Sequence, residues 1–66
     1  MSKENAIAEA VELMNASLAN MEAALTVIEY SVSNDRPIPT LAKITVKESC
    51  EDIQTSCAYL SKIVDD

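Results

Sequence analysis

The two cysteines have more capacity for chemistry than any other side chains in this sequence. Cys50 and Cys57 lie seven residues apart in a chain of 66 residues that has no histidine and no glycine. On one helix, residues seven apart are separated by about 10.5 Å along the axis. A disulfide requires Cα atoms within about 7 Å of each other. If the two cysteines share a helix, they therefore cannot bridge each other.

Other chemical roles for these thiols have little support. Structural and catalytic zinc sites need three or four ligands, and there is no histidine to complete a set. A reactive thiolate needs a nearby cation or a helix N-terminus, and neither is expected beside these thiols. Without glycine the chain cannot form a phosphate-binding loop. We expect no catalytic residues, no metal and no cofactor, so the protein is predicted not to be an enzyme. The cysteines are predicted to be small core residues.

The charge balance bears on the partners. Eleven acidic residues against five basic ones give a net charge of −6. This excess disfavours binding to nucleic acid, which depends on neutralising phosphates with Lys and Arg, and to anionic membranes. The most apolar stretch, residues 23–28, is too short to span a bilayer. The first residues, MSKENAIAEAV, lack the apolar run of a signal peptide. We therefore expect a cytoplasmic protein with a protein partner.

Two long segments carry the apolar spacing of helices that pack along a narrow seam. In the first, apolar residues recur at alternating intervals of four and three. Its a positions are Val11, Leu18, Leu25 and Val32, and its d positions are Ile7, Met14, Met21 and Ile28. The second segment continues the pattern at Val46, Cys50, Ile53, Cys57, Leu60 and Val64. The spacing predicts one helix over residues 3–33 and another over residues 40–64.

The segment between them contains both prolines, which stop a helix. The sequence SNDRPIP predicts a turn over residues 34–39, with Asn34 in the left-handed conformation and Thr40 as the cap of the second helix. The fold class is therefore all-α: an antiparallel, heptad-patterned two-helix hairpin that forms one domain over residues 1–66. The a and d residues are expected to form its seam, with Glu29 beside Lys47 at the e edge.

The g positions are small almost throughout, and Leu13 and Val27 at c positions lie beside them with Tyr59 and Ile63 close by, which makes each helix more apolar than a two-stranded seam requires. A chain this short also needs a partner to gain stability, since disulfide and metal are excluded. We therefore predict a homodimer in which two hairpins form a four-helix bundle. The oligomer interface is predicted to contain Ala10, Leu13, Ser17, Ala24, Val27, Ser49, Ser56, Tyr59 and Ile63.

A second cluster of interest lies at the turn. Leu41 and Ile44 fall at f and b positions, outside the predicted seam. One possibility is that the chain folds them back under the turn, and another is that the second helix starts late with an irregular first turn. Otherwise they are exposed and mark a docking site. If they are exposed, the partner-binding site is predicted at Arg36, Ile38, Leu41, Lys43 and Ile44.

The function predicted from these features is that of a small acidic protein–protein interaction module, which acts as a regulator, inhibitor or accessory subunit. The alternative is a chaperone or co-chaperone hairpin that completes the helical bundle of its partner. Two further hypotheses for the function are less favoured. One is a dimeric RNA-binding hairpin of the Rop type, which this chain resembles only in size and outline. The other is an acidic mimic of nucleic acid.

Overall fold

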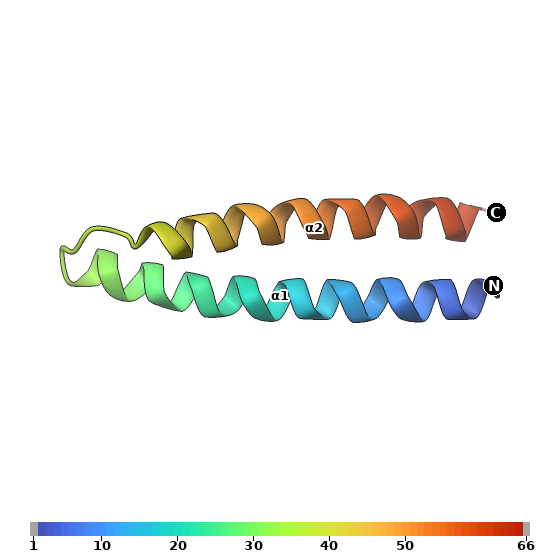
Figure 1. Ribbon diagram of the computed structural model, residues 1–66, viewed down its shortest axis with the longest axis horizontal. Coiled ribbons are helices and arrows are strands. Elements are labelled where there is room, and N and C mark those ends of the chain that lie inside the picture. The colour runs from blue at the N-terminus through green and yellow to red at the C-terminus, as the bar shows by residue number, and fades with distance from the viewer. Residues whose placement is uncertain (1, 66) are drawn as a thin grey trace.

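The computed structural model describes residues 2–65 and shows two antiparallel helices joined by a short turn (Figure 1). Helix α1 spans Lys3–Ser33 and helix α2 spans Thr40–Asp65. The predicted all-helical hairpin is confirmed. The terminal residues 1 and 66 of the predicted domain lie outside the described residues. Within the described range the hairpin is a rod, with Cα extents of 49 × 15 × 14 Å.

The start of α1 is fixed by its cap. Ser2 has an extended backbone, and its side-chain oxygen accepts a hydrogen bond of 3.2 Å from the backbone N–H of Asn5. This bond satisfies one of the four N–H groups that have no partner inside the helix, and Glu4 adds a negative charge in the first turn.

The end of α1 is a Schellman motif built without glycine. The backbone N–H of Arg36 donates to the carbonyl of Ser31 at 2.8 Å, and that of Asp35 donates to Val32 at 3.2 Å. The residue in the left-handed conformation is Asp35, with φ 53°. The prediction that Asn34 takes this conformation is therefore wrong. Asn34, with φ −107°, instead donates its side-chain amide to the carbonyl of Tyr30 at 2.8 Å.

The start of α2 also differs in detail. Thr40 is already inside the helix, and the carbonyl of Pro39 accepts the hydrogen bond from the backbone N–H of Lys43 at 3.2 Å. Proline has a fixed φ and no backbone N–H, but its carbonyl can accept the first hydrogen bond of the helix. Pro39, rather than Thr40, therefore occupies the cap position.

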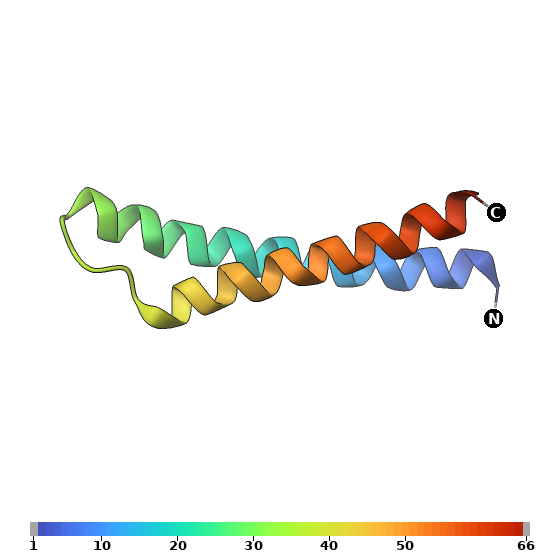
Figure 2. The same cartoon turned by 90° about the horizontal axis from the view of Figure 1, so that it is seen from above.

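The contact between the helices is centred on small residues that recur every seven positions. We call this set the small-residue stripe: Ala10, Ser17, Ala24 and Ser31 on α1, and Ala42, Ser49 and Ser56 on α2. Each of these side chains is buried, with exposed fractions of 2–7%. Small side chains let helix backbones approach closely over their whole length. Figure 2 shows the two rods crossing at a shallow angle, as this contact allows.

This centre is not the one predicted. The a and d residues were expected to form the hairpin seam, yet Val11, Leu18 and Leu25 are 44–46% exposed. On an ideal helix with 100° per residue, d positions lie about 40–60° from the stripe and a positions about 100° from it. The d residues are accordingly half-buried, while the a residues lie beyond the edge of the contact.

The predicted role of the cysteines is corrected for the same reason. Cys50 and Cys57 occupy a positions of α2 and are both exposed, so they are not core residues of the hairpin. The predicted Glu29–Lys47 contact across the hairpin is not formed either. The e positions point about 160° away from the stripe, so these two exposed side chains lie on the outer flanks of the molecule.

The stripe makes a direct prediction for stability. Ala24→Leu introduces a large side chain where the backbones are close, and we expect it to lower the free energy of unfolding by about 1–3 kcal/mol or more. Urea denaturation followed by circular dichroism measures this. Ala16→Leu, at an exposed position of the same helix, is the matched control and should change stability by less than about 0.5 kcal/mol. Equal effects of the two substitutions would contradict the placement of the stripe.

One member of the stripe carries an unsatisfied polar group. The Oγ of Ser56 is buried and has no hydrogen-bond partner. A buried hydroxyl without a partner loses its hydration without compensation, at about 1–3 kcal/mol. We therefore expect Ser56→Ala to raise the midpoint of thermal unfolding. A lower midpoint would show that the hydroxyl is satisfied in solution.

Candidate functional site

The uncovered a and d side chains form the largest candidate site. We call this surface the a/d face. Its exposed members are Val11, Leu18, Leu25, Val32, Cys50, Cys57 and Val64, and its half-buried members are Ile7, Met14, Met21, Ile28, Val46, Ile53 and Leu60. Both helices contribute, because a and d lie on the same side of the small-residue stripe in an antiparallel pair. The face therefore runs along the length of the rod.

Exposure to solvent is unusual for a surface made mainly of apolar side chains. Val32 and Val64 are 61% and 68% exposed, at the turn end and the open end of the rod respectively. Soluble monomers seldom expose contiguous apolar patches larger than a few hundred Å², and larger ones mark interaction sites. A face along a rod 49 Å long and about 15 Å wide approaches the ~800 Å² that each partner contributes to a standard interface.

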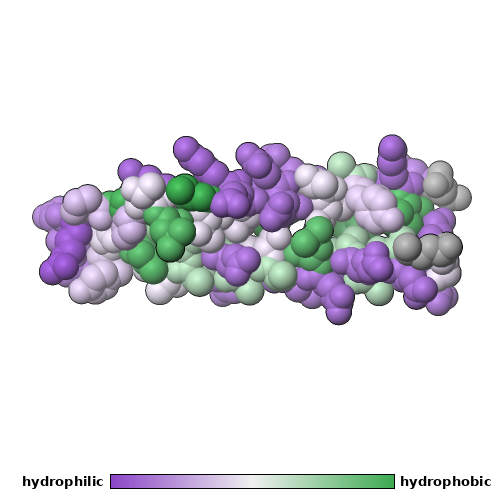
Figure 3. Space-filling view, in the orientation of Figure 1, coloured by the Kyte–Doolittle hydropathy of each residue, from purple (hydrophilic) through white to green (hydrophobic). Residues whose placement is uncertain are grey.

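On the opposite side of the stripe, the apolar surface is interrupted by polar residues. Figure 3 shows hydrophobic side chains there as separate clusters, one toward the turn and one toward the open end, with hydrophilic surface between them. Two grooves lie on this side. The turn-end groove has a volume of about 300 Å³ and is lined by Asn20, Ala23, Ala24, Val27, Pro39, Leu41, Ala42 and Thr45. The open-end groove, of about 230 Å³, is lined by Glu9, Ala10, Leu13, Thr55, Ser56 and Tyr59.

The residues predicted for the oligomer interface fall into two groups. The small ones, which are Ala10, Ser17, Ala24, Ser49 and Ser56, are buried between the helices of one hairpin. With so little surface left, they cannot provide the contact area of an interface with another chain. The larger ones stay accessible: Leu13, Val27 and Tyr59 are 44–51% exposed along the grooves, and Ile63 is half-buried.

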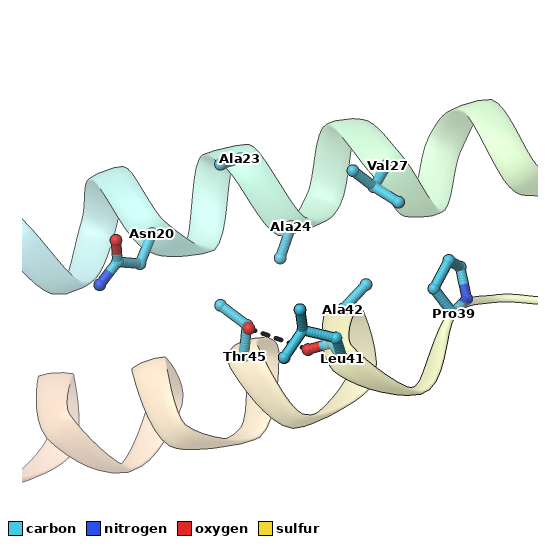
Figure 4. Close-up of a pocket in the computed structure, with 8 residues that line it drawn as sticks. All are labelled: Asn20, Ala23, Ala24, Val27, Pro39, Leu41, Ala42 and Thr45. Carbon is cyan, nitrogen blue, oxygen red and sulfur yellow. Dashed lines mark hydrogen bonds between the residues drawn. The ribbon is translucent and has the colours of Figure 1, made fainter.

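The turn-end residues are brought together only in part. Leu41 is 75% exposed and Ile44 is 45% exposed, so neither folds back under the turn. Figure 4 shows Leu41 beside Ala42 and Thr45 on α2, with Val27 on the facing helix across the turn-end groove; the hydroxyl of Thr45 donates to the carbonyl of Leu41 at 2.8 Å.

The polar members of the predicted turn-end site are less well placed. Lys43 follows Leu41 by two residues, which turns it about 200° around the helix, toward the a/d face. It therefore does not border the turn-end groove. Ile38 is half-buried in the turn, and Arg36 is exposed there.

Residues 2–65 contain neither a cluster of metal ligands nor a candidate membrane span. No group of three or more His, Cys, Asp or Glu side chains among them could hold a metal ion. Neither helix combines the length and apolar character needed to cross a membrane, in the part of the chain that the structure describes.

Comparisons with protein-family models, with curated proteins and with solved structures give no significant match.

The exposure of Leu41 can be tested against its buried neighbour. Leu41→Asp should leave the free energy of unfolding within about 0.5 kcal/mol of the original chain, since its side chain is largely in water. Ala42→Asp places a carboxylate in the small-residue stripe and should destabilise the hairpin by several times that amount, because a buried charge without a partner is costly. Thermal unfolding by circular dichroism distinguishes them. Unfolding by Leu41→Asp would mean that this side chain is part of the core.

Proposed function

We propose that this protein is a non-enzymatic protein–protein interaction module that acts as a regulator, inhibitor or accessory subunit. The observation that carries the proposal is the a/d face: apolar side chains at regular spacing on both helices, exposed or half-buried along the rod and interrupted on α2 by Lys43 near the turn. Apolar burial is the main favourable contribution to protein association.

The proposed assembly is a homodimer in which two a/d faces meet and form a four-helix bundle. A side chain such as Leu18 or Leu25 contributes on the order of 1–2 kcal/mol when the exposed half of its surface is covered. Many such side chains on two copies supply a driving force that a lone hairpin lacks. The seam predicted from the a and d spacing then lies between hairpins, with the small-residue stripe inside each one.

The bundle leaves the groove side of each hairpin open for a different protein. Leu41, Val27 and Pro39 give the turn-end groove an apolar lining, and Leu13 and Tyr59 border the open-end groove. The net charge of −6 favours a target with a basic surface, because charge complementarity speeds and orients association. In this proposal the a/d face holds the module together, while the grooves meet the target.

The a/d face can be separated from the groove side by two matched substitutions. Leu25→Glu and Leu13→Glu make the same chemical change at side chains that are 46% and 51% exposed. A buried carboxylate opposes association, so Leu25→Glu should shift the chain from dimer to its monomer mass of 7.2 kDa in sedimentation equilibrium. Leu13→Glu should leave the dimer intact.

Two results would count against this assignment. The original chain sedimenting as a monomer at micromolar concentration would remove the homodimer and favour the chaperone-type alternative, in which a different protein covers the a/d face. Dissociation by Leu13→Glu but not by Leu25→Glu would place the interface on the groove side.

A further inference from the structure

Two hairpins can cover each other's a/d faces in two ways. A two-fold axis along the rod places both turns at the same end and sets α1 against α2 of the other copy. A two-fold axis across the rod places the turns at opposite ends, and sets α1 against α1 and α2 against α2. In both arrangements neighbouring helices are antiparallel, so the helix dipoles do not decide between them.

We infer that the a/d face binds a second copy of this chain with the two turns at the same end. The inference rests on the proposed homodimer and specifies its geometry. Size complementarity across the face and charge complementarity at its rim support it, and both come from the different composition of the two helices.

The a-position side chains, which point most directly out of the face, differ in size between the two helices. On α1 they are the large residues Val11, Leu18, Leu25 and Val32, while the central ones on α2 are Cys50 and Cys57. With the turns together, Leu18 of α1 lies level with Cys50 of the partner copy and Val11 with Cys57, whereas Leu25 lies nearest Lys43. Large therefore meets small at the two thiols, on both edges of the bundle. With the turns opposed, leucine meets leucine on one edge and cysteine meets cysteine on the other.

That second arrangement packs poorly. Protein interiors are close-packed, and a void as small as a methylene group lowers stability. Leucines facing each other require a wide spacing between helices, whereas cysteines facing each other require a narrow one. One rigid hairpin cannot satisfy both spacings at once without leaving a cavity along the α2 edge.

The e positions, which border the face, carry opposite charges on the two helices. On α1 these include Glu22 and Glu29, and on α2 they include Lys47; all three side chains are exposed. Within one hairpin they lie on opposite flanks and cannot meet. With the turns together, the partner's Lys47 lies along the same edge as both glutamates. With the turns opposed, the glutamates lie along the edge formed by the two α1 helices, away from Lys47 of either copy.

The distance between the two turns tests the arrangement. Ser33→Cys places a spin label at the exposed end of α1, in a Cys50→Ala, Cys57→Ala background that keeps the a positions small. The dimer of this background is first confirmed by sedimentation. Pulsed dipolar spectroscopy should then give one distance well below the 49 Å length of the rod, and a label at Ser2→Cys should give a similarly short one.

Each other outcome is decisive. A Ser33 distance close to the rod length shows opposed turns and overturns the inference, while the homodimer stands. A dimer that forms in the original chain but gives no resolved distance from either label shows that the copies lack a defined arrangement and also overturns it. A monomer in the original chain overturns the homodimer itself, and this inference with it.

A charge swap gives a second readout. Lys47→Glu should weaken the dimer several-fold at low salt, since it places like charges along the shared edge. Combining it with Glu22→Lys and Glu29→Lys should restore the affinity. Under opposed turns, Lys47 and the two glutamates lie on different edges of the bundle, and the combination would give no rescue.

Discussion

The structure depends on the close approach of two helices along side chains no larger than serine. Ala and Ser at every seventh position leave nothing to hold the backbones apart, so this stripe becomes the axis of the hairpin. On the a/d side of the stripe, exposure then follows the angle from it. Residues 40–60° to one side are half-covered, those at 100° are uncovered, and those at 160° face water. The exposed cysteines, the a/d face and the separated Glu29 and Lys47 all follow from it.

Much of the fold could be predicted from the sequence, because its signals are local. The apolar period requires helices, and the prolines with Asn34 interrupt them at a single place. Ser2 is a typical cap and serves as one. The assignments that failed, at Asn34 and Thr40, are shifts of one residue. Asx residues next to each other can exchange the left-handed position, and a carbonyl can begin a helix without help from a side chain.

The surface that faces the other helix could not be predicted in the same way. An apolar arc that includes g, d and a positions offers two faces, and hydrophobicity alone favours the larger side chains of a and d. The size of Ala24 or Ser56 argues for a different contact, since small residues gain by bringing backbones together rather than by filling space. The small residues assigned to the oligomer interface, such as Ala24 and Ser56, therefore lie inside the hairpin, and the a residues assigned to its seam lie outside it. Leu41 and Ile44 were ambiguous because exposure depends on the path of the turn.

A row of nearly identical small side chains has one further consequence. Shifting one helix past the other by seven residues sets alanine and serine against alanine and serine again, so the contact itself is close to degenerate under that translation. The information that selects one alignment must come from elsewhere, and residues 34–39 are the covalent link that supplies it. Their short span and the hydrogen bonds from Asp35 and Arg36 to α1 limit how far α2 can slide along α1. In this protein the bend in the chain selects among alignments that the helices alone would find almost equivalent.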